Sequence, residues 1–122
     1  MQGQMFDLSR FRRCVWDGPF GLSFGFMNTT TSFNFPSVSP PYAIAVSNGV
    51  TPLNVTMYVP VPATGIMWCH ELINLGTGAG TITIKGSSSG NPTVGSVAAG
   101  KRAEIVWNPT AATPDWVVFL SA

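Results

Sequence analysis

Apolar and polar residues alternate with period two along the chain from Pro36 onward, and glycine, proline or asparagine interrupts the alternation every few positions. The segments "LNVTMYV" (53–59) and "GTITIK" (80–85) are examples. Successive side chains of a strand point to opposite faces of a sheet, so this pattern indicates strands with one buried face. No segment carries an apolar stripe at the helical period, and thirteen glycines with ten prolines would interrupt a helix. The chain is therefore predicted to be all-β.

Seven short strands at regular spacing predict an antiparallel β-sandwich or jelly-roll-like domain over residues 37–122. We expect the strands at 42–47, 53–59, 66–75, 80–85, 93–97, 102–108 and 115–121. A length of 122 residues suits one such domain preceded by an arm.

Residues 1–36 differ in character and predict an extended N-terminal arm. Seven of the eight phenylalanines lie there, which a flexible linker would not carry. The alternation at Leu22, Phe24 and Phe26 indicates an extended edge segment whose aromatic side needs a surface to lie on. That surface can be the chain's own core or a neighbouring polypeptide, and the lack of charge favours a neighbour.

Charged residues make up only 9% of the chain, against about 25% in a typical protein. Asp17 and Glu71 enclose a stretch with no Asp, Glu, Lys or Arg, and we expect protein contacts to cover much of it. No apolar run approaches the ~20 residues of a membrane span, so no membrane association is expected. The N-terminus lacks the apolar core of a secretory signal, which predicts synthesis in a cytoplasm.

The net charge of +1 predicts no direct contact with nucleic acid. The one locally basic segment is "RFRR", residues 10–13. We interpret it as a solvated or carboxylate-paired turn of the arm.

The segment "WCHELINLGTGAG" (68–80) contains Cys, His and Glu in succession and invites a metal or catalytic reading. Alternation in a strand places Cys69 and Glu71 on one face and His70 and Leu72 on the other. Adjacent Cys69 and His70 therefore cannot bind one metal ion together. The chain has one histidine and two cysteines, so neither a metal site nor a cofactor is expected. His70 is predicted to lie on a sheet surface or in an interface.

The glycines of "GTGAG" are followed by the alternating segment "TITIK" rather than by a helix, which argues against a dinucleotide-binding loop. They predict a β-hairpin turn in which glycine supplies a positive φ. Glu71, Glu104 and Asp115 are isolated carboxylates, and no catalytic residue is expected. An enzyme is therefore the weakest of the functional classes considered.

Two residue sets keep alternative interpretations. Cys14 and Cys69 can form a disulfide, although cytoplasmic synthesis favours reduced thiols. The aromatic residues Trp68, Trp107 and Trp116 fit core layers or oligomer contacts better than a carbohydrate-binding platform.

The succession "VPVPATG", "ELINLGTGAGTITIKG", "SVAAGKRAEIVWN" and "DWVVFLSA" resembles the small β-sandwich virion proteins of tailed bacteriophages, especially capsid decoration (cement) proteins and some tail-fibre modules. The resemblance covers about residues 58–122 and rests on turn and strand signatures. It implies a dimer or trimer, with a trimer favoured, seated on the outer capsid surface and clamped by an N-terminal arm. The partner would be the major capsid protein, and synthesis would take place in the host cytoplasm.

Together, the composition and the resemblance lead us to expect a non-enzymatic capsid decoration protein. The expected arm contacts are Phe6, Phe11, Arg12, Arg13, Phe20, Phe24, Phe26, Phe33 and Phe35. The expected oligomer or ligand contacts are Trp68, His70, Trp107 and Trp116. The alternative is a tail-fibre or receptor-binding module that uses exposed tryptophans to bind carbohydrate.

Overall fold

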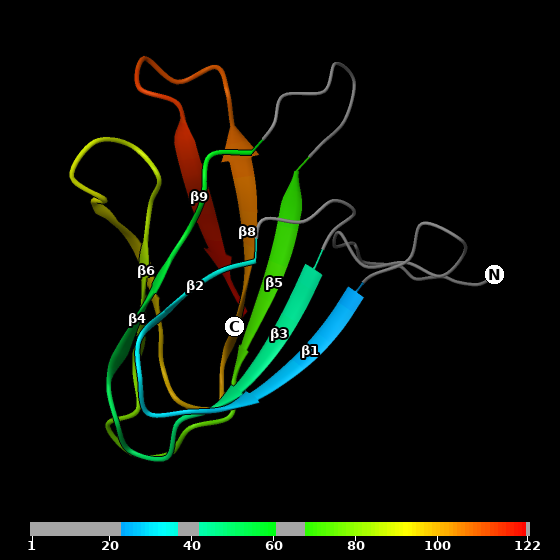
Figure 1. Ribbon diagram of the computed structural model, residues 1–122, viewed down its shortest axis with the longest axis vertical. Helices are drawn as coiled ribbons and strands as arrows, with labels where there is room; N and C mark the ends of the chain where they lie inside the picture. The colour runs from blue at the N-terminus through cyan, green and yellow to red at the C-terminus, as the bar shows by residue number, and fades with distance from the viewer. Residues whose placement is uncertain (1–22, 37–41, 61–67, 122) are drawn as a thin grey trace, which may run out of the picture.

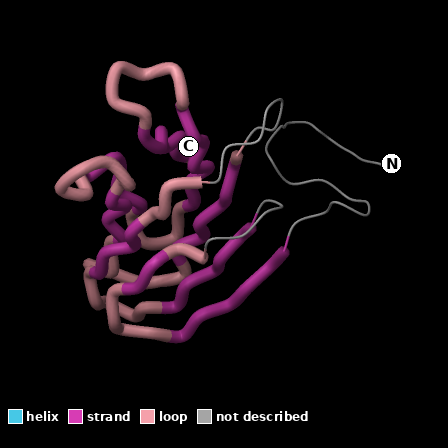
Figure 2. Tube along the Cα trace, turned by 45° about the horizontal axis from the view of Figure 1, so that its top comes forward, coloured by secondary structure: helices cyan, strands magenta, loops and turns pink. Residues whose placement is uncertain are grey.

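The computed structural model describes residues 23–36, 42–60 and 68–121, which form nine strands in two facing sheets (Figure 1). The strands are β1 (Ser23–Asn28), β2 (Phe33–Asn34), β3 (Tyr42–Ser47), β4 (Leu53–Thr56), β5 (Cys69–Asn74), β6 (Ile82–Lys85), β7 (Thr93–Val97), β8 (Arg102–Asn108) and β9 (Asp115–Leu120). One sheet has the order β1-β3-β5-β8-β9, and the other β2-β4-β6-β7. The described ranges contain strands and loops but no helix (Figure 2). The all-β prediction is confirmed.

From β1 to β6 the chain crosses from one sheet to the other after every strand (Figure 1). Each strand from β3 to β6 therefore lies parallel to the strand two places before it. The β5–β8, β6–β7 and β8–β9 pairs are antiparallel. The sheets are thus mixed, and the prediction of an antiparallel sandwich is wrong in its strand pairing. Period two is common to parallel and antiparallel strands, so the alternation could not distinguish them.

The "GTGAG" segment is also not a hairpin turn, because β5 and β6 belong to different sheets. It joins the two sheets at the end where the turn after β3 also crosses. The amide of Thr77 donates a hydrogen bond of 2.7 Å to the carbonyl of Gly49 in that neighbouring turn. The expected use of positive φ is confirmed at Gly78, whose φ is 55°.

Strand positions follow the sequence pattern closely. Strands β3, β7 and β8 have the expected bounds, and β4, β5, β6 and β9 lie within the expected ranges. Strands β1 and β2 come from residues that the sequence assigned to the arm, and they pair with β3 and β4. Met27 and Phe33 pack against the core, because their strands complete the edges of the two sheets.

Both sheets contribute their inward faces to one hydrophobic core. The five-stranded sheet supplies Ile44, Leu72 and Ile105, and the four-stranded sheet supplies Val55 and Ile84. All five side chains are almost fully removed from solvent. Burial of each such side chain contributes about 1.5–3 kcal/mol, so this shared core holds the sheets together.

Two buried asparagines fasten the crossing turns at one end of the molecule. Asn74 donates its amide to the carbonyls of Gly80 and Val97, at 2.7 and 2.8 Å, and its side-chain oxygen accepts from the amide of Gly76. Asn48 donates to the carbonyl of Gly80 at 3.1 Å. A Cβ at Gly76 would overlap the side-chain oxygen of Asn48, so only glycine fits there.

Asp115, the first residue of β9, ties the five-stranded sheet to the β6–β7 loop. Its carboxylate accepts hydrogen bonds from the amides of Ser87 and Trp116, both at 2.8 Å, and from the Ser88 hydroxyl at 2.6 Å. Burial alone would raise the pKa of this carboxyl group. The hydrogen bonds from Ser88, Ser87 and Trp116 outweigh that effect and lower the pKa below its ordinary value of 3.8.

Candidate interaction surface

The outward face of the five-stranded sheet is mainly apolar. Strand register places its side chains in rows across the sheet, which contain Phe26, Ala45, Ile73 and Arg102, then Ala43, Glu71, Glu104 and Phe119, then Cys69, Val106 and Val117. Eight of these eleven side chains are hydrophobic. A sheet with one solvated face normally carries polar residues there, so this face is suited to a contact.

Solvent-exposed apolar groups on this face lie toward the two edges of the sheet. On β1, Phe26 is 63% exposed. On β9, Val117 and Phe119 are 38% and 57% exposed, and we call these two residues the β9 patch. Leu120 is 58% exposed, but it pairs with the core residue Ala103 and so belongs to the other face of the strand. In the centre of the face, Ala43, Ala45, Cys69 and Glu71 are buried. The face therefore offers two separate apolar contact areas.

One ion pair crosses the centre of the face. The Arg102 guanidinium lies 3.0 Å from the Glu71 carboxylate, and only 5% of the Glu71 side chain is exposed. Glu71 and Glu104 are directly opposite in the β5–β8 register. Two facing carboxylates repel each other, and Arg102 supplies the charge that lets Glu71 stay buried.

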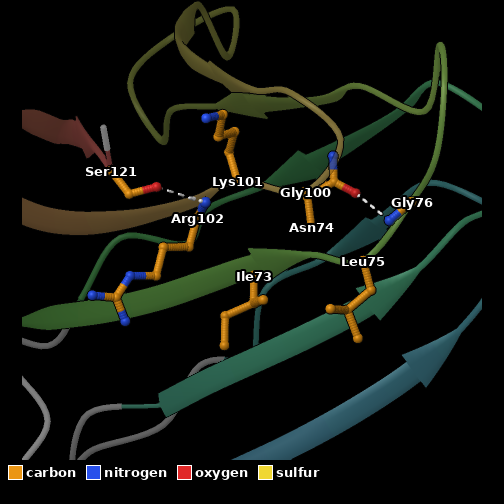
Figure 3. A pocket seen from close by; sticks show the side chains of 8 residues that line it. All are labelled: Ile73, Asn74, Leu75, Gly76, Gly100, Lys101, Arg102 and Ser121. Carbon is orange, nitrogen blue, oxygen red and sulfur yellow. Dashed lines mark hydrogen bonds between the residues drawn. The ribbon is translucent and has the colours of Figure 1, made fainter.

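Three surface hollows include residues of β8, and two of them also include residues of the β9 patch. The largest, about 440 Å³, lies between Ile73 and Leu75 on one side and Lys101 and Ser121 on the other (Figure 3). The Ser121 hydroxyl accepts a hydrogen bond of 3.1 Å from the Arg102 amide and holds the chain end beside this hollow.

The other two hollows adjoin Phe119 directly. One of about 310 Å³ is lined by Val106, Trp107, Asn108, Val117 and Phe119, and one of about 200 Å³ includes Glu104. An exposed apolar centre with hollows beside it and charged groups around it has the layout of a protein contact.

The outward face of the four-stranded sheet has the opposite character. It presents Asn54, Thr83, Ser96 and Lys85, which are half-buried or exposed. Lys85 donates a hydrogen bond of 3.0 Å to the Thr93 hydroxyl. This face satisfies the usual pattern of a solvated sheet surface.

His70 lies in the interior and not on a surface, so the prediction for this residue is wrong. Its side chain has no exposed area and lies between Phe35 and Trp116, with ring centroids at 4.9 and 5.3 Å. The prediction that Cys69 and His70 point to opposite faces is confirmed. Alternation separates the two faces of β5, but it does not say which face meets the other sheet.

Tyr58 completes the interior aromatic cluster, and no pattern in the sequence indicated its place there. Its hydroxyl lies 2.8 Å from Nε2 of His70, and its backbone carbonyl accepts a hydrogen bond of 2.8 Å from the Trp116 indole. Trp107 packs edge-on against Trp116, with 5.4 Å between ring centroids. These polar groups are paired inside the core, which is what a structural role requires.

The predicted contact residues therefore fall into different environments. Phe35 and Trp116 are buried in the core, while Phe33, Trp68 and Trp107 are partly buried against it. Phe26 alone of the expected arm residues is described as an exposed side chain. Phe24 belongs to β1, where its backbone pairs with Ala43. Phe6, Phe11, Arg12, Arg13, Phe20 and Cys14 lie outside the described residues.

The β9 patch was missed by the sequence interpretation, which placed Trp116, Val118 and Leu120 in core layers. A signal was present, because Val117 and Phe119 alternate with Trp116 and Val118. The strand is therefore apolar on both faces. An apolar outward face on an edge strand is suited to a contact.

Comparison with protein-family models, with curated proteins and with solved structures found no match to this chain. Within the described ranges, no group of three or more His, Cys, Asp or Glu residues is placed to hold a metal ion. The same ranges contain no helix long and apolar enough to cross a membrane.

Proposed function

We propose that this chain is a non-enzymatic structural protein of a tailed-bacteriophage virion, a capsid decoration or cement protein. Its β-sandwich body, jelly-roll-like in outline, would sit on the outer capsid surface, with residues N-terminal to β1 acting as an arm. The observation that carries the proposal is the β9 patch, because two neighbouring apolar side chains exposed on the same face of one strand suit burial against another polypeptide.

The partner of the β9 patch in this proposal is the major capsid protein. Burial of an exposed Phe or Val side chain contributes about 1.5–3 kcal/mol before ordering costs. Each copy would add a modest contact, and many copies on one shell would strengthen it against internal pressure. The low charge of the chain supports the same proposal, since ionic groups are depleted in the centres of protein contacts.

The test is binding to capsids of the virus that encodes the chain, prepared without it. Phe119→Asp places a charge in the β9 patch, and we expect capsid affinity to fall by about tenfold or more. Thr83→Asp adds the same charge on the polar outward face of the four-stranded sheet and should leave binding unchanged. Wild-type affinity for Phe119→Asp would refute the role of the patch, and failure of the wild-type chain to bind would refute the decoration function.

The arm has a separate test. Removal of residues 1–36 would also remove β1, β2 and the buried Phe35, so the informative truncation is removal of residues 1–22. We expect the truncated chain to keep its melting temperature and lose capsid occupancy. Full occupancy after this truncation would show that the arm is not needed.

The carbohydrate-binding alternative retains one supporting observation. Trp107 and Asn108 line the 310 Å³ hollow, and an aromatic ring beside an amide can bind a sugar. Trp116 is buried and Trp68 packs on the core, so neither offers an exposed platform. Saturable binding on a glycan array that is lost in Asn108→Ala would favour this alternative.

A further inference from the structure

Among the described strands, β1 lies at one edge of the five-stranded sheet and has a neighbour on one side only, β3. The other three edges of the two sheets are short, irregular or covered. Strand β2 has two residues, and the β6–β7 pairing is interrupted by a register shift beside Lys85. Strand β9 approaches β7, where a Cβ at Gly95 would lie 2.7 Å from the Cβ of Val118.

Within the part of the chain that the structure describes, strand β1 has none of these protections. Its six residues, "SFGFMN", pair with β3 over their whole length without a register shift. They include no proline and no charged residue. Natural proteins use such features to block unwanted pairing at sheet edges, and an apolar edge that lacks them is a template for another strand.

The direction of the backbone groups on β1 follows from one hydrogen bond. The amide of Thr29 donates to the Ser47 carbonyl at 3.1 Å and so points toward β3. Backbone groups alternate sides along a strand, so those of Gly25 and Met27 also point toward β3. Those of Phe24, Phe26 and Asn28 point to the open edge, where the Phe26 side chain is 63% exposed.

We propose that β1 pairs with β1 of a second copy of this chain, antiparallel, across a two-fold axis at Phe26. In this register Phe26 lies opposite Phe26 of the second copy, and Phe24 lies opposite Asn28 of the second copy. All three residues that point to the open edge then exchange backbone hydrogen bonds. The two five-stranded sheets become one continuous sheet.

Two features of β1, its lack of charge and the phenylalanine at the proposed axis, favour a second copy of the chain over another kind of strand as the partner. Identical strands related by a two-fold axis must run antiparallel, and only a strand without net charge meets its own copy without repulsion. Strand β1 carries no charge at any position. The two phenylalanine rings at the axis add a cross-strand aromatic contact.

This contact is independent of the virion role, since it requires only that the chain meets itself. It also differs from the trimer implied by the sequence resemblance. A two-fold contact closes after two copies, whereas a trimer needs a head-to-tail contact between different surfaces.

The first experiment measures the native mass of the full chain and of Phe26→Pro. Proline removes an amide that points to the open edge and leaves the hydrogen bonds to β3 intact, which is how proline is tolerated in edge strands. We expect a dimer for the wild type and for Phe26→Leu, and a monomer with an unchanged circular dichroism spectrum for Phe26→Pro. A monomeric or trimeric wild type, or a dimeric Phe26→Pro, overturns the proposal.

The second experiment tests the axis itself and does not depend on proline. Phe26→Lys and Phe26→Glu each place like charges opposite one another, so each variant alone should be monomeric. Mixed in equal amounts, the two variants should form a heterodimer, because the opposite charges then face each other. A mixture that remains monomeric, or a single variant that still dimerises as tightly as the wild type, would contradict a two-fold axis at Phe26.

Discussion

The outward faces of the two sheets differ in composition although the strands beneath them are built alike. Both sheets bury alternate aliphatic residues in the same core. On the four-stranded sheet the remaining positions are Thr, Asn, Ser and Lys, whereas on the five-stranded sheet they are mainly Phe, Val, Ile and Ala. A core needs only one apolar face per sheet, so the core alone does not explain the second apolar face. The outward face of the five-stranded sheet is therefore the side of the molecule on which the contacts proposed above would form.

The largest expected effect on stability comes from the hydrogen bonds by which Asp115, in the five-stranded sheet, holds the β6–β7 loop of the four-stranded sheet. Asp115→Ala removes the acceptor for the amides of Ser87 and Ser88, and we expect a loss of about 2–3 kcal/mol in the free energy of unfolding. Urea denaturation measures it. A loss below about 0.5 kcal/mol would mean that the β6–β7 loop is held by its own turn and not by β9.

The same carboxylate predicts a pH dependence. Its pKa is lower in the folded chain than the ordinary value of 3.8, so its contribution is complete above that value and is lost as pH falls through the folded pKa. We expect the free energy of unfolding to decrease on acidification below about pH 4. Asp115→Asn should flatten this part of the profile, and an unchanged profile would assign the acid sensitivity to other groups.

A smaller effect is expected from the charges of the two outward faces. Arg102→Ala leaves the buried Glu71 carboxylate without its partner and should cost about 2 kcal/mol, less than for a fully buried pair because Arg102 is partly exposed. Lys85→Ala removes a solvated charge from the other face and should cost under about 0.5 kcal/mol. Equal costs in urea denaturation would mean that the two faces do not differ in burial.

The next effect in size is that of the hydrogen bond between Tyr58 and His70 in the interior. This bond belongs to neither outward face, so its contribution to stability is a reference for the contributions of residues on the two faces. Tyr58→Phe removes the hydroxyl that lies 2.8 Å from Nε2 of His70, and we expect a loss of about 1 kcal/mol. Differential scanning calorimetry measures the change. A neutral result would indicate that water or a neighbouring group replaces the hydroxyl.

The smallest effect on stability is expected in the β9 patch. Phe119→Ser truncates a side chain that is 57% exposed, and the free energy of unfolding should change by under about 0.5 kcal/mol. Binding of a hydrophobic dye to the native chain should fall, whereas Thr83→Ser should leave it unchanged. Strong destabilisation by Phe119→Ser would show that this ring belongs to the core.

The sequence predicted strand positions well and residue environments unevenly. The bounds of β3, β7 and β8 followed directly from alternation and turn residues. Phe35 and Phe26 were assigned together to an arm contact, yet one is buried in the core and the other is exposed. Both are phenylalanines in short apolar segments, and only the strand that each joins separates them. For the same reason, His70 could be placed opposite Cys69 but not in the interior.

Taken alone, the sequence determined which segments from Tyr42 onward are strands, which residues share a face of each strand, and where glycine is needed for a turn such as that at Gly78. These properties depend on backbone geometry over a few neighbouring residues. The tertiary structure decided that β1 to β6 alternate between two sheets as parallel strands, and that one sheet keeps a second apolar face. The physical reason is that strand pairing joins residues far apart in the chain, and a period of two is the same whichever partner a strand finds.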